Sequence, residues 1–399
     1  MPMSNPPTSE RTTVGIVGAG PAGLMLSHLL ARSGIESVVV DTRTRHEIET
    51  TQRAGILEQD SVRMLTDTGV DGHVLTAGYE HEGIELRFEG AGHRIDFQDL
   101  VGASVWLYPQ TDVFVDLVNA RERDGGDVRF GVSGTRVADL TAQPLLAFTD
   151  AGGVAREIRC HHLVGSDGSR SMCRRELPES LRRQYSKEYP FAWFGILAEA
   201  PPSAPELVYA RSERGFALIS QRTDVLQRMY FQCSPDEDVA QWSDDRIWDE
   251  LQTRVAGDGF TLQQGPITEK TVLAFRSFVV EPMRHGNLFL AGDAAHTVPP
   301  TGAKGLNLAL QDVKVLHEVL ESAVLGGRPE ALDKYSPRAL QRVWKAQQFS
   351  YRMTTMLHTL PDETPFDQRR QLGELTSIVT SRHGAGHIAE CYTGWPSSR

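Results

Sequence analysis

Two kinds of hydrophobic pattern follow each other near the N-terminus. The apolar run Thr13–Val17 predicts a short buried strand, and Pro21–Ser33 carries apolar residues at helical spacing. Gly34 is typical of the position just after a helix end. The apolar run Ser37–Val40, closed by Asp41, predicts a second strand. Together these segments predict a βαβ unit, in which a helix joins two parallel strands.

The pattern changes further along the chain. Leu207–Gln232 holds β-rich runs broken by polar turns, which predicts an antiparallel sheet outside the βαβ fold. Asn287–Ala291 predicts another buried strand, and from Gly305 to about Leu360 the pattern is helical. We therefore expect an α/β protein in which separate stretches form a Rossmann-type fold and a mainly antiparallel sheet is inserted between them.

The expected division of the chain has four parts. They are a disordered tail over residues 1–12, a discontinuous nucleotide-binding domain over 13–180 and 268–345, a β-sheet substrate domain over 181–267, and a helical C-terminal region over 346–399 that closes the site.

Composition limits the partners that the protein can have. Hydrophobic residues make up 40% of the 399 residues and charged residues 23%, an ordinary globular balance. The formal net charge of −11 argues against a nucleic acid or an anionic membrane as partner, because both need a basic surface. Since the chain shows neither a secretory signal nor an apolar run long enough to cross a membrane, we expect a cytoplasmic protein.

Cysteine and histidine positions favour neither disulfides nor a metal site. The four cysteines are far apart and form no CxxC pair, so we expect reduced thiols. His383 and His387 have helical spacing, but the Gly-Ala-Gly between them weakens a helix and no third ligand is apparent. We therefore predict no metal.

The first motif with chemical meaning is the Gly-rich turn that follows the first predicted strand. Gly18 allows a tight turn, Gly20 lets the backbone approach a pyrophosphate, and Gly23 lets the helix pack on the sheet. The N-terminus of the helix, which includes Ala22, offers free N–H groups to phosphates. Asp41 can accept a hydrogen bond from a ribose hydroxyl. The motif predicts a dinucleotide site, with a purely structural turn as the alternative, and leaves FAD and NAD both open.

Two later motifs narrow the cofactor. Gly165–Gly168 has the sequence GSDG after an apolar pair, and Leu288–His296 has the sequence LFLAGDAAH. The three motifs, in this order and spacing, resemble the class A flavoprotein aromatic hydroxylases, from about Thr13 to Pro396. The strongest stretches are Arg53–Gln59, Arg214–Leu218 and Arg276–Asn307, the last of which contains the specific loop Pro299–Asn307. The resemblance implies that the dinucleotide is FAD.

The resemblance also implies which residues hold FAD. Asp293, at the end of a strand, would accept hydrogen bonds from the ribityl hydroxyls, and an ordinary helix cap is its alternative role. The helix that starts near Leu306 and Asn307 would point its positive end at the flavin pyrimidine, where negative charge appears on reduction. The residues expected to bind FAD are Gly18, Gly20, Ala22, Gly23, Asp41, Arg53, Gln110, Asp293, Gly302, Leu306 and Asn307.

For the substrate, the resemblance implies a carboxylate clamp of Ser220, Arg222 and Tyr230. A guanidinium group can bind a benzoate carboxylate through two hydrogen bonds, and two hydroxyls can complete its shell. Taken alone, Arg222 would more often be half of a surface salt bridge. The match across Ser220-Gln221-Arg222 favours the clamp.

At the opposite end of the substrate, Tyr209 and Tyr392 match the two tyrosines that contact the phenol. A relay through them to His81 would carry the phenol proton to solvent, because histidine titrates near neutrality. A lone histidine is more often a plain surface or core residue. Pro300 and Thr301 match positions whose backbone lines the site beside the reactive carbon, so we count Pro300 with the relay residues as catalytic.

The implied activity is that of a flavin monooxygenase, which converts 4-hydroxybenzoate into 3,4-dihydroxybenzoate with O2 and NADH or NADPH through an FAD C4a-hydroperoxide. The resemblance also suggests a homodimer to which residues 346–399 contribute. Three alternatives stay open: a hydroxylase of a related acid such as 3-hydroxybenzoate or 4-aminobenzoate, a plain NAD dehydrogenase, and a non-catalytic binding protein on the same fold. Gly292-Asp293 argues against the dehydrogenase, and the clamp and the loop Pro299–Asn307 argue against the binding protein.

The nicotinamide preference is expected to depend on Thr42–Glu49, directly after the first ribose-binding acid. NADPH-using members of the family carry Arg-Gln and then a Tyr there, whereas this chain has Glu47 at the Tyr position and Thr51 in place of a further Arg. Because carboxylates repel a 2′-phosphate, we predict that NADH is used as well as or better than NADPH. A solvated helix face is the alternative role of Glu47. The residues expected to bind the nicotinamide nucleotide are Arg43, Glu47, Arg53, Arg170, Arg174 and Arg276.

Overall fold

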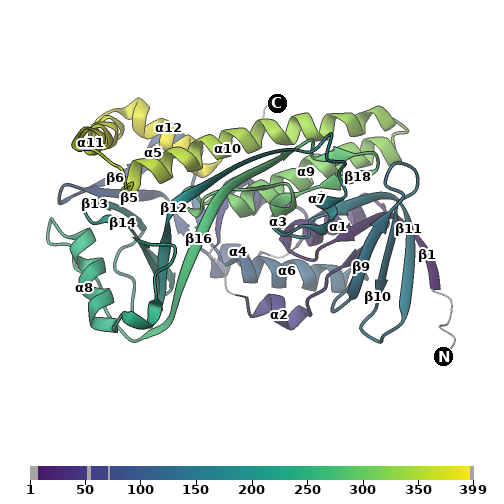
Figure 1. Cartoon of the computed structure of the whole chain (residues 1–399), viewed down its shortest axis with the longest axis horizontal. Coiled ribbons are helices and arrows are strands. Elements are labelled where there is room, and N and C mark those ends of the chain that lie inside the picture. Colours follow the sequence, from purple (N-terminus) through teal and green to yellow (C-terminus); the bar gives the residue numbers. More distant parts are fainter. Residues whose placement is uncertain (1–7, 52–54, 71, 396–399) are drawn as a thin grey trace.

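The computed structural model describes residues 8–51, 55–70 and 72–395. Its first sheet is largely parallel and has the strand order β17-β18-β11-β1-β2-β8 (Figure 1). Strand β1 lies in the middle and pairs in parallel with β2 and β11, as the predicted βαβ unit requires. The strands are β1 (Thr8–Val17), β2 (Ser37–Val40), β8 (Asp127–Arg129), β11 (Ala155–Gly165), β17 (Arg284–His285) and β18 (Leu288–Leu290), and the antiparallel pair β9 (Ser133–Ala138) and β10 (Leu145–Thr149) extends from β11.

The first strand begins earlier than the sequence suggests. Residues 8–12 were expected to belong to a disordered tail, but they continue β1, where Thr8 is paired with Arg156 of β11. Glu10 supports this end of the strand, since its carboxylate accepts hydrogen bonds from Arg129 and lies 3.7 Å from Arg156. Partners more than a hundred residues away therefore make a strand of a polar stretch that has no apolar pattern of its own. Residues 1–7 lie outside the described part.

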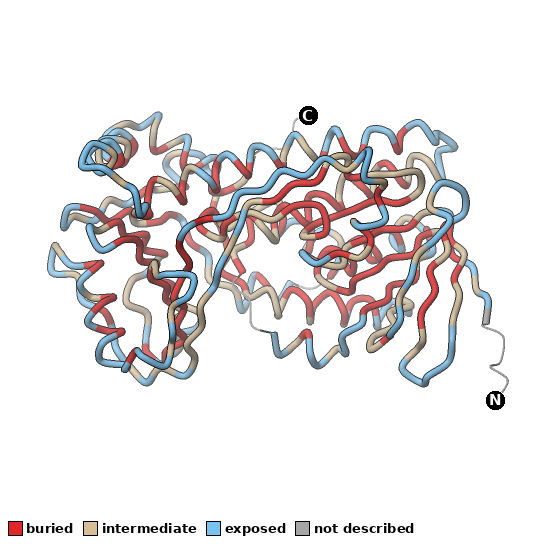
Figure 2. The backbone as a smooth tube through the Cα atoms, in the orientation of Figure 1, coloured by how far each residue is buried: buried red, intermediate tan, exposed pale blue. Residues whose placement is uncertain are grey.

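Helices cover this sheet, and a hydrophobic core lies between the sheet and these helices. Helix α1 (Pro21–Arg32) is buried over most of its length and contacts α6 (Gln110–Arg123) and α9 (Gly305–Val324). Gly34 has φ +75° directly after α1, which confirms the predicted helix stop. Figure 2 shows the continuous buried layer between this sheet and its helices. The shorter helices of this half are α2 (Arg45–Glu49), α3 (Gln59–Asp67), α4 (His73–Ala77) and α7 (Met172–Arg175).

The second sheet is almost entirely antiparallel, with the order β19-β16-β12-β15-β14-β13-β5-β6. Its long strands β12 (Arg183–Ala198) and β16 (Ile267–Glu281) run diagonally across the molecule and join its two halves (Figure 1). The strands β13 (Leu207–Ser212), β14 (Gly215–Thr223) and β15 (Leu226–Cys233) confirm the predicted antiparallel segment.

The boundaries of this sheet differ from the expected division. Strands β5 (Gly83–Phe88) and β6 (Ala91–Asp96) come from the stretch 13–180, and β16 and β19 (His296–Thr297) come almost wholly from 268–345. All four belong to the second sheet, because β5 pairs with β13 and β16 pairs with β12. A short third sheet is made of β3 (Ile56–Glu58), β7 (Val105–Leu107) and β4 (Tyr79–His81).

The two faces of the second sheet are covered by different helices. Helix α8 (Asp244–Val255) packs on one face, and α5 (Phe97–Val101), α10 (Tyr335–Leu357), α11 (Pro365–Val379) and α12 (Arg382–Thr393) enclose the other. Helix α12 forms across His383 and His387 in spite of the intervening glycines, because Ser381 caps it and Ile388 and Tyr392 pack in the core. No helix in the described ranges is long and apolar enough to cross a membrane.

Candidate active site

The Gly-rich turn has the geometry expected of a dinucleotide site. Gly18 has φ +109°, and a Cβ there would lie 2.3 Å from the carbonyl oxygen of Ser166. A Cβ on Gly23 would lie 1.9 Å from the oxygen of Gly18, so both positions exclude side chains for structural reasons. A Cβ on Gly20 would meet no atom within 4 Å, which leaves open space at the N-terminus of α1. Asp41 closes the turn by accepting a hydrogen bond from the N–H of Ala19 at 2.9 Å.

The second predicted FAD segment follows β18 directly. A short 3-10 turn (Gly292–Ala294) places Asp293 half-buried at the carboxyl end of the parallel strands. The carboxylate of Asp312, on α9, accepts hydrogen bonds from the N–H of Gly292 at 2.9 Å and from Nε2 of His296 at 2.6 Å. Burial lowers the pKa of His296, but the adjacent Asp312 carboxylate more than offsets this, so the net shift is upward. This buried ion pair holds the turn that carries Asp293.

The predicted clamp residues lie on neighbouring strands of the second sheet. Ser220 is on β14 and Tyr230 is on β15, and both are buried. Arg222 follows near the end of β14, and burial lowers the pKa of its guanidinium, with a further contribution from the nearby Arg228. The register pairs Ser220 with Arg228, and paired residues of an antiparallel ladder point to the same face. The structure thus gathers two guanidinium groups and two hydroxyl side chains in one region.

Arg228 is a member of this group that the sequence analysis missed. Its Nε donates a 2.8 Å hydrogen bond to the hydroxyl of Tyr230, and its Nη2 lies 3.7 Å from Glu269. Its Nη1 is buried and has no partner within the described residues. A buried donor of this kind calls for an acceptor. The only signal in the sequence was the alternation of side chains along β15, which puts Arg228 on the same face as the predicted clamp residue Tyr230.

The two tyrosines predicted to contact the substrate phenol are joined by a hydrogen bond. The hydroxyls of Tyr209 on β13 and Tyr392 on α12 are 2.6 Å apart, and both side chains are almost fully buried. Burial raises the pKa of both tyrosines. Tyr392 also stacks on Phe97, with ring centroids 5.3 Å apart. The pair therefore forms a fixed, dry, neutral hydroxyl unit.

His81, the predicted end of the relay, is 2% exposed and lies on β4. Burial lowers the pKa of its imidazole. Neither ring nitrogen has a hydrogen-bond partner among the residues that the structure describes, so His81 is not bonded directly to Tyr209 or Tyr392. The relay to His81 stays a prediction.

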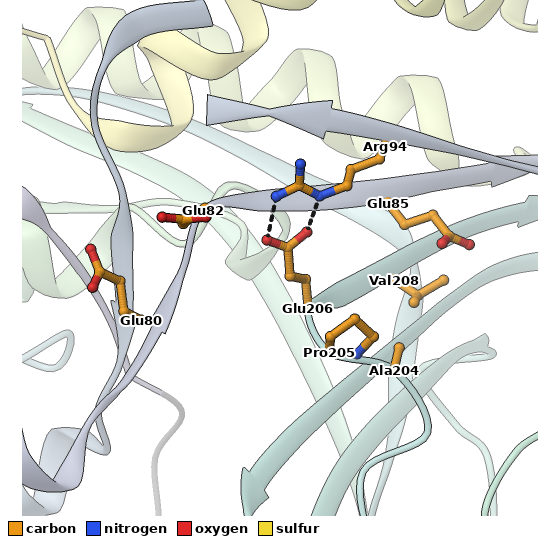
Figure 3. Close-up of a pocket in the computed structure, with 8 residues that line it drawn as sticks. All are labelled: Glu80, Glu82, Glu85, Arg94, Ala204, Pro205, Glu206 and Val208. Carbon is orange, nitrogen blue, oxygen red and sulfur yellow. Dashed lines mark hydrogen bonds and ion pairs between the residues drawn. The ribbon is translucent and has the colours of Figure 1, made fainter. Parts of the chain in front are cut away.

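A pocket of about 390 Å³ lies beside strands β4, β5 and β13 (Figure 3). Glu80, Glu82, Glu85 and Glu206 line it, and Arg94 bonds both carboxylate oxygens of Glu206, at 2.8 and 2.9 Å. None of the predicted substrate residues lines this pocket. Its excess of carboxylates would repel a benzoate, so we do not place the active site there.

Comparisons with known proteins agree with this geometry. The sequence profile of a family described as "FAD binding domain" matches residues 11–350. The chain belongs to this family. It is 43% identical over 388 residues to the p-hydroxybenzoate hydroxylase of Acinetobacter baylyi, a match that covers 97% of this chain and 96% of the relative.

The chain is also similar to enzymes that are named for other aromatic compounds. A 3-(3-hydroxy-phenyl)propionate/3-hydroxycinnamic acid hydroxylase of Mycobacterium avium is 28% identical over 82% of this chain and 58% of its own length. The p-nitrophenol 4-monooxygenase of Pseudomonas putida has the same fold, with a TM-score of 0.82, 18% identity and coverage of 97% of this chain and 100% of that one. The protein is therefore an FAD-dependent aromatic monooxygenase of this family.

Because the chain belongs to an FAD-binding family, the residues expected to bind FAD must leave room for a flavin. The open space at Gly20 and the free N-terminus of α1 fit a pyrophosphate. The loop before α9 contains a 3-10 turn (Pro300–Gly302) and then Ala303 at φ +53°, and this backbone can approach a flat ring closely. Thr301 and Gly302 are buried, whereas Pro300 and Leu306 are partly exposed. Gln110 begins α6 and is partly exposed, and Arg53 lies outside the described residues.

The side chain of Asn307, a residue expected to bind FAD, is engaged in hydrogen bonds within the protein. Its Oδ1 accepts from the N–H of Glu58 at 2.9 Å, and its Nδ2 donates to the carbonyl of Ile56 at 2.8 Å. These hydrogen bonds tie β3 to the start of α9, so the side chain acts as a brace and only the backbone of this residue is available to a ligand.

Lys304 is the second important residue that the sequence analysis missed. It is buried, and its Nζ donates to Glu58 Oε1 at 2.7 Å and to the carbonyl of Tyr392 at 2.8 Å. Arg342 donates to the other oxygen of Glu58 at 3.0 Å. Burial lowers the pKa of Lys304. The network connects the loop that is expected to lie beside the flavin to the helix that carries Tyr392.

The arginines predicted to bind the nicotinamide nucleotide fall into two groups. Arg174 donates to the carbonyls of Ala294 at 2.8 Å and Ser169 at 2.7 Å, and both Arg174 and Arg276 lie over the ring of Phe278. Arg170 is exposed nearby in sequence. Arg174 thus contacts the turn that carries Asp293 and lies beside the expected flavin site.

The second group lies in the segment after Asp41 and is already neutralised. Arg43 contacts Asp41 at 3.3 Å, and Arg45 bonds both Glu49 and Glu122 at 2.7 Å. Glu47 forms a capping box with Thr44 at the start of α2, and this lowers the pKa of its carboxylate. The negative charge of Glu47 is therefore retained at neutral pH.

Proposed function

We propose that the protein hydroxylates 4-hydroxybenzoate at the 3-position, giving 3,4-dihydroxybenzoate with O2 and NADH or NADPH. The observation that carries this proposal is the buried pair of Tyr209 and Tyr392, with hydroxyls 2.6 Å apart. Tyr209 lies on the sheet that also carries Ser220, Arg222 and Tyr230, and Tyr392 reaches it from α12. A site with cations at one end and a hydroxyl pair at the other suits a para-hydroxylated benzoate. The relative named p-hydroxybenzoate hydroxylase supports the same substrate.

FAD, when bound, accepts hydride from the nicotinamide and activates O2 for transfer of one oxygen atom to the ring. The chain's own residues bind and orient the substrate. Arg222, with Ser220 and Tyr230, holds the carboxylate, and the reduced hydration of a buried guanidinium strengthens that contact. Thr301, buried in the loop before α9, and Pro300 beside it keep the ring in place and exclude water.

The tyrosine pair promotes ionisation of the substrate phenol. Because burial raises their pKa values, Tyr209 and Tyr392 stay protonated and can donate to a phenolate oxygen. The phenolate directs electron density to the neighbouring carbon, where the oxygen is added. Burial lowers the pKa of His81 and so favours its neutral imidazole, which would hold a proton from the relay only transiently.

The decisive experiment is NADH and NADPH consumption by the purified flavoprotein, with and without 4-hydroxybenzoate, with the product identified by chromatography. We expect substrate-stimulated consumption and 3,4-dihydroxybenzoate as product. 3-Hydroxybenzoate and 4-aminobenzoate serve as competing substrates in the same assay. Preferential turnover of either one, or no stimulation by 4-hydroxybenzoate, would contradict the proposal.

NADH is proposed to be used as well as or better than NADPH. The support is that the arginines of the segment after Asp41, Arg43 and Arg45, are paired with carboxylates, and Glu47 adds a negative charge there. A 2′-phosphate would find no uncompensated cation at these described positions, whereas a ribose hydroxyl tolerates carboxylates. A kcat/KM for NADPH tenfold or more above that for NADH would overturn this inference.

We also propose a cytoplasmic homodimer. The dimer is supported by two exposed aromatic residues of the long helix α10, Trp344 and Tyr351. The ring of Trp344 also packs against that of Tyr185 on β12, which is exposed as well. Exposed aromatic groups on one helix face are frequent in subunit interfaces. Light scattering on the purified protein tests this, and a monomer at micromolar concentration would refute it.

A further inference from the structure

A buried histidine outside the predicted site connects both ends of the proposed substrate pocket. His358 follows α10 directly and is fully buried, and its Nε2 accepts a 2.7 Å hydrogen bond from Nε1 of Trp193 on β12. Its Nδ1 lies 2.8 Å from the carbonyl oxygen of Thr354. Because Nε2 accepts, Nδ1 must carry the proton and donate it. These two bonds therefore select one neutral tautomer.

The ring of His358 is fixed in orientation as well as in charge. It stacks between Phe191 and Phe216, with centroid distances of 4.5 and 4.4 Å. Burial lowers the pKa of this histidine to about 3, so it stays neutral at physiological pH. A neutral imidazole held in this way is a rigid hydrogen-bond bridge.

Each end of this bridge leads to a residue of the proposed pocket. The indole of Trp193 packs on the ring of Tyr230, a member of the carboxylate clamp, with centroids 5.0 Å apart. On the other side, the hydroxyl of Thr354 lies 3.0 Å from the hydroxyl of Thr301, in the loop beside the reactive carbon. Both of these contacts are buried.

We propose that His358 is a positioning residue for the substrate, which sets the Trp193 wall against the clamp and links it to the loop that carries Thr301. This inference rests on the proposed function. The mechanism requires the ring to be held within a few tenths of an ångström of its reactive geometry, and one rigid bridge between the two ends serves that need.

The test compares the holoenzymes of H358F and H358Q with the wild type. H358F keeps the stacking but removes the acceptor, which leaves the Trp193 N–H buried and unpaired. We expect the Kd for 4-hydroxybenzoate, measured by calorimetry, to rise at least fivefold, and the product formed per NADH to fall as hydrogen peroxide increases. The amide oxygen of H358Q can accept the indole N–H, so this variant should recover most of the binding.

Two further variants separate positioning from general stability. W193F should raise the Kd as H358F does, and the double variant should be no worse than either single variant, because both break the same bond. W242F is the matched control: Trp242 belongs to the core on the opposite face of the sheet and its indole bonds Glu237 at 2.9 Å, so its Kd should match the wild type.

The outcomes distinguish the two levels of inference. A wild type that forms no 3,4-dihydroxybenzoate refutes the proposed function. Wild-type turnover together with an unchanged Kd in H358F, or with effects of W193F and H358F that multiply, refutes the positioning role alone. If H358F fails to fold, W193F and H358Q still decide the question, since the first must raise the Kd and the second must not.

Discussion

Removing one hydroxyl from the buried tyrosine pair tests the proposed phenol activation directly. In Y392F, the hydroxyl of Tyr209 loses the partner that lies 2.6 Å away, in a place where burial excludes bulk water. A hydrogen bond to a charged group such as a phenolate contributes about 1.5–3 kcal/mol, and its loss propagates through Tyr209 to the substrate. Since 1.4 kcal/mol corresponds to about a factor of ten, we expect the phenolate fraction of bound 4-hydroxybenzoate at pH 8 to fall roughly tenfold or more.

The assay is the ultraviolet difference spectrum of 4-hydroxybenzoate bound to the oxidised enzyme, recorded as a function of pH. The Kd should change less than about fivefold, because the carboxylate clamp is intact and one neutral hydrogen bond contributes about 1 kcal/mol or less. Product formation in a single turnover should fall in proportion to the phenolate fraction.

The matched control is Y335F. Tyr335 is as deeply buried as Tyr392, and its hydroxyl donates to the carbonyl of Leu290 at 2.7 Å, so this variant removes the same atom from another part of the core. Its substrate ionisation should equal that of the wild type. If Y392F also ionises bound 4-hydroxybenzoate as the wild type does, the proposed relay is wrong.

Four substitutions test the cofactor site, the buried ion pair and the titration of a core histidine. G20A should fold normally but bind FAD at least tenfold more weakly, because its Cβ has open space in the protein and enters the expected pyrophosphate position. G23A should not fold, since its Cβ would lie 1.9 Å from a carbonyl oxygen. Circular dichroism and FAD titration distinguish the two variants, and normal FAD affinity in G20A would contradict the placement of the pyrophosphate. E58Q leaves Lys304 buried without a carboxylate and should cost about 3–5 kcal/mol of unfolding free energy in urea, a value that a loss below about 1 kcal/mol would contradict. Burial lowers the pKa of His358 from 6.5 to about 3, so below pH 6.5 the unfolded chain binds a proton there that the native protein does not, and the free energy of unfolding must fall as the pH drops. Between pH 6 and 4, H358F should reduce the dependence of the unfolding free energy on pH by about 1.4 kcal/mol per pH unit. An unchanged pH dependence would show that His358 is protonated in the native state.

Local pattern was enough to predict the βαβ unit and the antiparallel strands. The apolar runs of β1 and β2 and the periodicity of α1 follow from residues that are neighbours in sequence. The polar beginning of β1 was missed because its strand conformation depends on β11, which lies far along the chain. Strands β5 and β6 lie in the stretch 13–180 and were not predicted as part of the second sheet, since the pairing of β5 with β13 leaves no local signal.

The candidate site shows the same division between local and distant information. Gly18, Gly23 and Asp293 belong to motifs whose geometry is decided within a few residues, and the structure agrees with their predicted places. Lys304 bonds the carboxylate of Glu58, 246 residues away in the sequence, and Trp193 bonds His358 across a separation of 165 residues. Neither partner can be inferred from spacing, because such pairs are fixed only when the two halves of the molecule pack together.

This packing has a consequence for the chemistry. Lys304, at the start of α9, bonds the carbonyl of Tyr392 as well as Glu58, so the loop beside the flavin and the phenol end of the pocket are held by one buried cation. Burial opposes the charged form of this lysine, and its two acceptors together offset that cost. Only the carbonyl of Tyr392 belongs to α12, so displacing α12 would leave the buried charge to Glu58 alone and would also separate Tyr392 from Tyr209. Docking of α12 therefore completes both the hydroxyl pair and the set of acceptors around Lys304.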